Sequence, residues 1–577
     1  MYDLVVRGGT LIDGTGSPRV DADVAIQGGR IAAIGDASTF GGAKAEIDAT
    51  GRIVAPGFVD IHTHYDAQAF WDTTLSPSPL HGVTTVSSGN CGFTLAPVTP
   101  DDTGYLARML ARVEGMPLEV IEASVTFDWG TTGEMFDRID GTLMLNCGFL
   151  VGHSALRRVV MHDDATRRAA TPAEIEQMRQ LLRAGLAAGG LGFSSTWSPS
   201  HSDHQGVPVP SRWAEREELL ALCDVVGEFD GTVLEFIPGT PPFSTDLVEL
   251  MADMSATARR PLNWNVLTVN KANAHLVDDL LAASDVADQR GGKVIALTAP
   301  GASRLRLSFQ SGFVLDMMPG WASFIGSSPQ ERIAALSDPE QRAQLGANAA
   351  KADTISLRYF ARWSDYVLET LSPENAEYNG KTVGEIAELR GQTPWDALCD
   401  VVVADELKTT MIPPARGDDD ESWRIRGRVW NDERALIGAS DAGAHLDMID
   451  TFNYTTVLLG EGVRKRQLLS LERAVHLLTD RPARLYGFRE RGRIQQGWHA
   501  DLVVFDEQTV GAGPVTMRRD MPGGGARVYG GAVGIDHVLV NGVPVVRGDQ
   551  FLTTRPGVLL RSGRDTTTET PLAEARV

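Results

Sequence analysis

Cysteine and long apolar runs are both scarce in this chain of 577 residues. Its four cysteines, Cys91, Cys147, Cys223 and Cys399, include no Cys-x-x-Cys pair, so a disulfide framework is not indicated and a reducing cytoplasm is expected. No uncharged apolar run reaches about 18 residues, and the N-terminus lacks the basic-then-apolar pattern of a signal peptide. We therefore expect a protein that is neither exported nor inserted in a membrane.

Basic residues are also in deficit. Lys and Arg total 53 against 75 Asp and Glu, which gives a formal charge of −22. Because most of such a surface repels polyanions, nucleic acid and anionic membranes are not expected as partners. The rest of the composition, with 43% hydrophobic and 22% charged residues, is that of an ordinary globular protein. No segment specifies an oligomer, so a monomer and a homo-oligomer both remain open.

Short β-rich runs occur at both ends of the chain. Residues 2–34 hold three such runs separated by glycine-containing turns, which predicts a small antiparallel β unit. The same texture returns at 492–506 and 535–550, where Asn541-Gly542 is a strong signal for a hairpin turn. Two β segments therefore bracket the middle of the chain.

The middle of the chain alternates apolar β-rich runs with amphipathic helical stretches, which is the pattern of βα units on a parallel sheet. One helix is clearly marked, because Thr171, Pro172 and Glu174 form a capping box with proline at the first helical position. We expect the α/β class. Eight candidate strands lie at 57–62, 82–88, 143–151, 190–195, 231–237, 262–268, 292–298 and 435–440.

A gap of roughly 135 residues separates the seventh and eighth strands, far more than one crossover helix needs. We expect a long insertion at about 300–434, with helix-start signals at Thr382 and Thr393 and a charged stretch at 418–428. Loops after barrel strands surround the active face, so the insertion is either a lid over a site or a surface subdomain.

Two histidines end the first predicted strand. His62 and His64 stand two apart in PGFVDIHTHYD, and residues i and i+2 of a strand point to the same face. We expect both imidazoles to converge at the C-terminal mouth of a barrel, where they can bind a metal. The alternative is a pair of incidental histidines near a turn.

Asp441 and Cys91 follow two other predicted strands. Asp441, in IGASDAGAH, would face the same cavity and could bind metal and accept a proton from water, or it could serve as a helix N-cap or turn residue. Cys91, in SSGNCGF, offers a soft sulfur ligand, the alternative being a buried structural cysteine. Cysteine and histidine ligands favour zinc over magnesium or calcium.

Further polar residues are candidates for substrate binding. His153 and Arg157, in GHSALR, could bind a polar or anionic substrate, although a structural salt bridge explains Arg157 equally well. His445 could orient Asp441 or bind substrate. His201 lies in a polar loop, where we expect it to be solvated.

Together these motifs resemble the amidohydrolase superfamily, and more closely its branch related to N-acyl-D-amino-acid deacylase, or D-aminoacylase. The resemblance implies a distorted (β/α)₈ TIM barrel at 57–490, joined to a small β-sandwich domain built from 1–56 and 491–577, with metal at the barrel mouth. The motifs cover nearly the whole chain: VVRGGTLIDGTG, GRIAAIG, IVAPGFVDIHTHYD, GVTTVSSGNCGFTLAPV, LVGHSALR, GASDAGAHL, LTDRPARLYGF and GRIQQGWHADLVVFD.

The resemblance also implies roles by position. His62 and His64 match the first-strand metal ligands. Cys91 matches the characteristic cysteine ligand. Asp441 matches the eighth-strand ligand and general base.

The chain departs from the family at strands five and six, where the deacylases usually carry metal-binding histidines. This chain has Glu235 in LEFIPG and Asn265 in NWNVLTV. Glu235 can still bind a cation, the alternative being a hydrogen-bonded barrel residue, whereas Asn265 is a weak neutral ligand that we assign to substrate binding. We expect one zinc ion, and a second is not specified. Leu267 stands where a basic residue usually grips a substrate carboxylate.

The leading hypothesis is a metal-dependent hydrolase acting on a small-molecule amide, either an N-acyl amino acid or a related amide. Metal-activated water would attack the carbonyl, and Asp441 would transfer the proton. The alternatives are a cyclic-amide or imide hydrolase, a nonhydrolytic lyase or decarboxylase, and a noncatalytic binding protein on the same scaffold. The retention of His62 and His64 together with Asp441 argues against the last.

Overall fold

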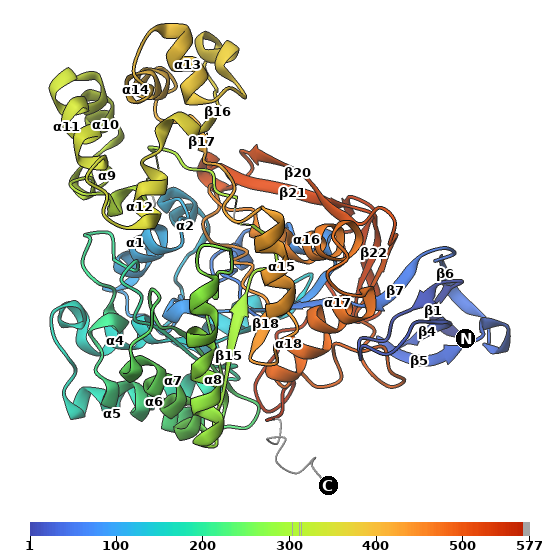
Figure 1. The fold of residues 1–577 in the computed structure, drawn as a ribbon. Coiled ribbons are helices and arrows are strands. Elements are labelled where there is room, and N and C mark those ends of the chain that lie inside the picture. Colours follow the sequence, from blue (N-terminus) through green and yellow to red (C-terminus); the bar gives the residue numbers. More distant parts are fainter. Residues whose placement is uncertain (303, 311, 313, 569–577) are drawn as a thin grey trace.

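Two parallel sheets occupy the centre of the computed structural model, which describes residues 1–568 except 303, 311 and 313 (Figure 1). Their strand orders are β10-β9-β8 and β11-β12-β13-β14-β15-β18. At one junction β10 is followed directly by β11, and at the other a parallel bridge pairs Thr63 with Ala442. The strands are β8 (Phe58–Asp60), β9 (Val83–Ser88), β10 (Asn146–Phe149), β11 (Val151–Gly152), β12 (Gly192–Thr196), β13 (Val233–Ile237), β14 (Pro261–Trp264), β15 (Lys293–Thr298) and β18 (Ala435–Ile437).

The predicted α/β class is confirmed, and every predicted strand of the middle segment overlaps an observed one, the third being divided into β10 and β11. Helices connect successive strands, and several stand side by side along one flank in Figure 1. These are α4 (His153–Met161), α5 (Pro172–Ala187), α6 (Arg216–Val226), α7 (Thr245–Ala258) and α8 (Val277–Gln289).

Helix α5 begins as its sequence predicts. The Thr171 hydroxyl oxygen accepts a hydrogen bond from the Glu174 backbone N–H, and the Glu174 carboxylate accepts one from the Thr171 N–H. The apolar face of the helix is buried at Met178, Leu182 and Leu186.

The segment between β15 and β18 is largely helical, with a two-stranded sheet of β16 (Val367–Glu369) and β17 (Thr410–Ile412). Its aromatic core includes Trp321, Trp363 and Trp395. Helices α13 and α14 begin after the predicted starts Thr382 and Thr393. The helices are α9 (Ala322–Ile325), α10 (Pro329–Ser337), α11 (Pro339–Ala349), α12 (Ile355–Phe360), α13 (Val383–Arg390), α14 (Pro394–Ala404) and α15 (Asp420–Val429).

Helices α9–α14 project from the rest of the molecule at the top of Figure 1, above α1 (Thr103–Val113) and α2 (Leu118–Ser124). An ion pair between Arg112 of α1 and Asp316 joins the projecting segment to the body. This segment therefore lies on the side of the sheets where α1 follows β9.

Both ends of the chain contribute to one mixed sheet of order β24-β23-β22-β19-β7-β2-β3. A four-stranded sheet, β5-β4-β1-β6, shares an apolar core with it that includes Val24, Val54 and Leu502. The strands are β1 (Tyr2–Arg7), β2 (Thr10–Leu11), β3 (Val20–Asp21), β4 (Asp23–Gln27), β5 (Arg30–Gly35), β6 (Ala43–Asp48), β7 (Ile53–Pro56), β19 (Leu502–Phe505), β22 (Ile535–Val540), β23 (Val543–Arg547) and β24 (Gln550–Phe551).

The predicted hairpin turn lies between β22 and β23, where Asn541 and Gly542 both have positive φ angles of 47° and 77°. The N-terminal unit is antiparallel as predicted at β1–β4 and β4–β5, but β6 pairs with β1 in parallel. β20 (Gly511–Arg518) and β21 (Arg527–Val533) form a second hairpin. It contacts the loop after β18, where the Val528 N–H donates a hydrogen bond to the Leu446 carbonyl.

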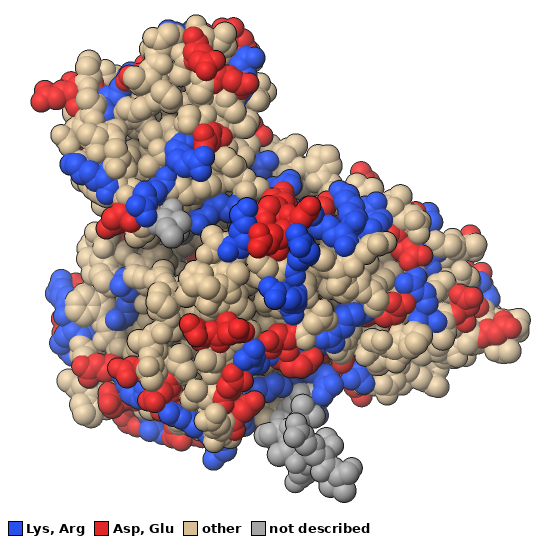
Figure 2. All heavy atoms as spheres, viewed as in Figure 1, with Lys and Arg blue, Asp and Glu red and all other residues tan. Residues whose placement is uncertain are grey.

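On the face drawn in Figure 2, acidic and basic side chains are interspersed over most elements. Among the residues that the structure describes, none of the helices has the length and apolarity that crossing a membrane requires.

Candidate metal centre

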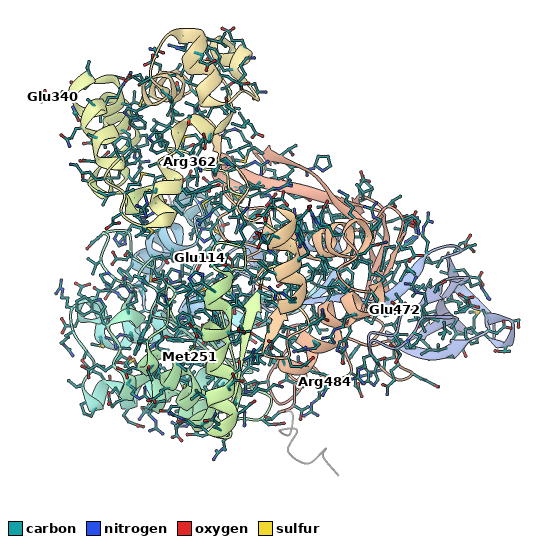
Figure 3. The ribbon with its side chains drawn as sticks, in the orientation of Figure 1. Glu114, Met251, Glu340, Arg362, Glu472 and Arg484 are labelled. Carbon is teal, nitrogen blue, oxygen red and sulfur yellow. The ribbon has the colours of Figure 1, made fainter. Side chains whose placement is uncertain are left out.

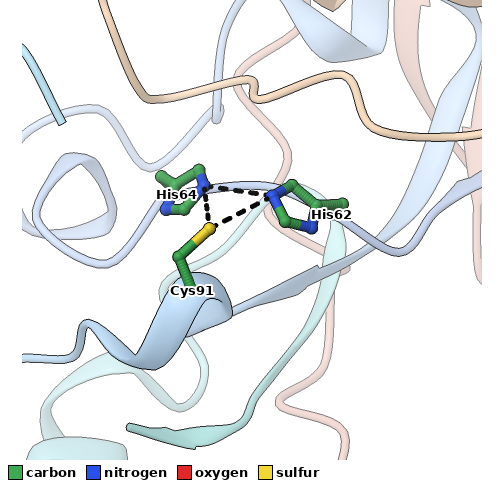
Figure 4. Close-up of side chains that lie close together, drawn as sticks. All are labelled: His62, His64 and Cys91. Carbon is green, nitrogen blue, oxygen red and sulfur yellow. Dashed lines mark hydrogen bonds between the residues drawn. The ribbon is translucent and has the colours of Figure 1, made fainter. Parts of the chain in front are cut away.

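Three buried side chains bring metal-binding atoms to one point (Figure 4). His62 and His64 follow β8, and Cys91 lies in the turn Asn90–Gly92 after β9. The Nε2 atoms of the two histidines are 3.3 Å apart, and Cys91 Sγ is 3.6 Å from His62 Nε2 and 3.8 Å from His64 Nε2. The predicted convergence of the two imidazoles is therefore present, and the cysteine joins them.

Asp441, in the loop after β18, lies beside the two histidines. Its Oδ1 is 3.0 Å from His62 Nε2 and 3.7 Å from His64 Nε2. The Asp441 side chain is 37% exposed, whereas the two imidazoles are buried. We call His62, His64, Cys91 and Asp441 the ligand cluster; its carboxylate is the part most accessible to an incoming molecule.

The distances among His62, His64 and Cys91 fit a tetrahedral zinc ion. Zinc bonds of about 2.05 Å to nitrogen and about 2.3 Å to sulfur place tetrahedral ligands about 3.3 Å apart for two nitrogens and about 3.6 Å apart for nitrogen and sulfur. The cluster shows 3.3 Å between its nitrogens and 3.6 and 3.8 Å from sulfur to nitrogen. Two imidazoles, a thiol and a carboxylate are also a donor set that zinc accepts.

Glycines allow the loops that carry these ligands to pass close to neighbouring backbone. Gly89 has φ +76°, and a Cβ there would lie 2.6 Å from the Leu150 carbonyl oxygen. Gly443 has φ +93°, and a Cβ there would lie 2.6 Å from the His64 carbonyl. A side chain at Gly89 would displace the turn before Cys91 from Leu150, and one at Gly443 would displace the loop after Asp441 from His64.

Glu235 and Asn265 lie behind His62, on its other ring nitrogen. The Asn265 amide contacts His62 Nδ1 and donates to Glu235 Oε1 at 3.0 Å. Glu235 Oε1 is itself 3.9 Å from His62 Nδ1, and Oε2 accepts a hydrogen bond of 2.8 Å from the Cys91 N–H. Both side chains are buried and hold ligands from behind, on the opposite side of the His62 ring from the point where the donor atoms meet.

Glu114 and Asp66 lie beside His64. Glu114 Oε2 is 3.2 Å from His64 Nδ1. Asp66 accepts a hydrogen bond of 3.0 Å from the Gly89 N–H, and its negative charge helps to raise the pKa of His64. Sequence reasoning did not assign either residue. The one available signal is at Glu114, an acidic residue at a helix C-terminus, where the helix dipole disfavours a carboxylate.

Charges within the site shift several pKa values. Burial alone would lower the pKa of His64, but the Glu114 and Asp441 carboxylates outweigh it and raise that pKa to about 9. Burial and the Glu235 carboxylate raise the pKa of the Cys91 thiol well above its ordinary value. Burial opposes ionisation of Asp441, yet the two imidazoles hold its pKa well below the usual range. A bound cation takes the place of the protons on such ligands.

His153 and Arg157 form a separate buried group. His153 Nδ1 is 2.8 Å from Ser195 Oγ, and Nε2 is 2.8 Å from Glu218 Oε1. Arg157 pairs with the same carboxylate and donates to the Arg168 carbonyl at 3.0 Å. None of the contacts of the described residues joins either side chain to the ligand cluster. The structure thus shows the salt-bridge alternative for Arg157.

His445 and His201 lie near the ligand cluster. The His445 backbone N–H donates to the Glu114 carbonyl, and burial lowers the pKa of its imidazole to about 4. His201, predicted to be solvated, is only partly exposed. Its Nδ1 is 2.8 Å from Thr196 Oγ1, its ring lies edge-on to Phe93, and burial lowers its pKa to about 3.

Comparisons with known proteins agree with this geometry. Residues 45–546 match the amidohydrolase family. N-acyl-D-glutamate deacylase of Alcaligenes xylosoxydans xylosoxydans is 32% identical, over 97% of this chain and 96% of its own length.

Two solved structures are similar over nearly their whole length. N-acyl-D-glutamate deacylase of Bordetella bronchiseptica, complexed with zinc and a phosphonate mimic of the tetrahedral intermediate, is 27% identical with a TM-score of 0.66, covering 97% of this chain and 99% of that one. A D-aminoacylase studied for the role of its binuclear metal centre is 25% identical with a TM-score of 0.65, covering 97% and 100%.

Proposed function

The chain belongs to the amidohydrolase family, and we propose that it is a zinc-dependent hydrolase of the amide bond in N-acyl amino acids or a related small-molecule amide. The observation that carries the proposal is the convergence of His62, His64 and Cys91, whose mutual distances fit one zinc ion, with Asp441 Oδ1 3.0 Å from His62 Nε2. Both the 32% identical relative and the zinc-bound structure are N-acyl-D-glutamate deacylases. N-acyl-D-amino acids are therefore the first substrates to test.

The proposal includes the finer architecture. The two parallel sheets, linked at β10–β11 and by the Thr63–Ala442 bridge, would form a distorted (β/α)₈ barrel over residues 57–490. The two mixed sheets would form a β-sandwich from 1–56 and 491–577. Residues at about 300–434 would be the insertion beside the barrel mouth.

His62, His64, Cys91 and Asp441 would hold the zinc ion. When bound, zinc supplies Lewis acidity that polarises a carbonyl and lowers the pKa of water toward neutrality. Glu235 and Asn265 would support this site from behind, since they contact the Nδ1 face of His62 and the backbone of Cys91. One ion per chain is the stoichiometry that this arrangement favours.

Asp441 would move the proton. It is the exposed member of the ligand cluster, and the flanking imidazoles keep it ionised, so it can accept a proton from an attacking water molecule. The same carboxyl can then protonate the leaving nitrogen. His445, which follows in the same loop, would contact the bound substrate or orient Asp441.

The test is hydrolysis by the purified, zinc-loaded chain. A panel of N-acyl-D-amino acids, their L-isomers, cyclic amides and simple carboxylic acids separates an amide hydrolase from a cyclic-amide hydrolase and from a lyase by the product released. Asp441→Asn is expected to lower the rate by about a thousandfold, since proton transfer and ligand charge are both lost.

Asp279→Asn, on the exposed face of α8, is the matched control and should leave the rate unchanged. Zinc binding with no turnover of any panel member would contradict the proposal and favour a noncatalytic binding protein. Turnover that survives Asp441→Asn would remove Asp441 from the mechanism.

A further inference from the structure

We propose that Glu114 is the positioning residue for His64, and that it also fixes the loop of Asp441 against the first-strand histidines. The inference rests on the proposed function, because it concerns how the chain prepares its metal ligands. Glu114 belongs to none of the parallel strands; it caps the C-terminus of α1, and Figure 3 labels it near the centre of the molecule.

The Glu114 side chain contacts Nδ1 of His64, the ring nitrogen that does not face the other members of the ligand cluster. Oε2 is 3.2 Å from Nδ1, while Nε2 of the same ring faces His62 and Cys91. A carboxylate that accepts the Nδ1–H proton fixes both the tautomer and the ring orientation, so that the lone pair of Nε2 is presented to a metal.

The setting of Glu114 indicates a specific role for its carboxylate. The side chain is 6% exposed, and a carboxylate at a helix C-terminus is opposed by the helix dipole. Burying such a charge is costly unless it is paired and hydrogen-bonded. Among the described residues, the ion pair recorded for Glu114 is with His64.

The backbone of Glu114 makes the second contact. Its carbonyl accepts a hydrogen bond from the His445 N–H, four residues after Asp441. Gly115 has φ +57°, and a Cβ there would lie 3.0 Å from the His445 Cα, so the chain can pass this close only as glycine. One residue thus links the ligand from β8 to the loop that carries the ligand after β18.

The experiment measures zinc affinity in solution, using zinc alone in competition with a chelator and no substrate. Glu114→Ala is expected to weaken zinc binding by about 10–100-fold, the range for losing an outer-sphere partner of a metal-binding histidine. Glu114→Gln should weaken it less, because its amide oxygen still accepts from Nδ1–H. Glu122→Gln, exposed on the neighbouring helix α2, is the matched control and should bind like the wild type.

Thermal unfolding of the zinc-free proteins, measured in parallel, separates positioning from stability. A merely structural Glu114 would lower the unfolding temperature and leave the zinc affinity of the folded protein unchanged, and that result would overturn the inference. If Glu114→Ala does not fold, the isosteric Glu114→Gln decides alone. A wild-type chain that binds no zinc would instead refute the proposed function itself, a result distinct from equal affinities of wild type and variants.

Discussion

Two buried histidine clusters in this molecule use similar residues in opposite ways. In the His153 cluster, formed by His153, Arg157, Ser195 and Glu218, each ring nitrogen of His153 has a partner at 2.8 Å and the guanidinium is paired with the carboxylate. These contacts pair donors with acceptors, so none of them calls for a metal ion.

In the ligand cluster, by contrast, electron-pair donors face one another. Two imidazole nitrogens and a sulfur lie 3.3–3.8 Å from one another, and the Asp441 oxygen lies 3.0 and 3.7 Å from the two nitrogens. Glu114, Asn265 and Glu235 contact these residues from the outside. In the proposed enzyme a zinc ion takes the place of the protons that these groups otherwise share. The difference teaches that a metal site is recognised by electron-pair donors that converge on one point, and not by histidine content or burial.

The largest expected effect is on the ligand cluster. His62→Ala should lose the bound zinc and lower amide hydrolysis by about a thousandfold or more, because the remaining ligands no longer surround the ion. Metal analysis and initial rates measure this. His275→Ala, at an exposed position, is the control. If His62→Ala retained zinc and activity, the ligand cluster would not be the metal site, and it would not differ from the His153 cluster in this respect.

The reverse behaviour is expected in the His153 cluster. Glu218→Ala leaves the fully buried Arg157 guanidinium without its carboxylate, which should lower the free energy of unfolding by about 3–5 kcal/mol. Zinc content per folded chain should not change. Denaturant titration measures the loss, with Glu217→Ala on the exposed face of the same helix as control. A loss of zinc without loss of stability would mean that this cluster belongs to the metal site.

Two buried cysteines sharpen the comparison. Cys91→Ser replaces a soft thiolate ligand by a weaker hydroxyl and should reduce zinc affinity by about 10–100-fold. Cys223→Ser, buried in α6, changes the same atom far from any ligand and should alter only stability. Chelator competition on both variants checks this, and equal zinc affinities would show that the Cys91 sulfur is structural.

The smallest effect is a pH dependence that only the ligand cluster should show. In the zinc-free protein the pKa of His64 is raised to about 9 and that of Cys91 stands higher still, so protons occupy these ligands at neutral pH. Zinc must displace them, and its affinity should therefore rise by about tenfold or more per pH unit between pH 7 and 9. Titrations corrected for the chelator's own protonation measure this slope, which a flat profile would contradict.

Much of the fold was predictable because its signals are local. The strand alternation, the capping box at Thr171 and the Asn541-Gly542 turn each depend on neighbouring residues, and all are present. The parallel pairing of β6 with β1 was not foreseen, since it joins segments about 40 residues apart and depends on tertiary packing.

The site was predictable where ligands are close in sequence or follow recognisable strand ends. His62 and His64 are two residues apart, and Cys91 and Asp441 end other strands, so topology brings all four together. Glu114 could not be predicted, because its partner His64 is 50 residues away and only the packing of α1 against the loop after β8 joins them. The pairing of His153 with Glu218, which makes it part of a buried cluster, could not be predicted either, because no local pattern connects the two residues.

The zinc content of the chain, purified without added metal or chelator and measured again after incubation with zinc, tests the central claim most directly. The account predicts about one zinc ion per chain, lost in His62→Ala and kept in Glu218→Ala. A chain that holds no zinc before or after incubation would contradict it.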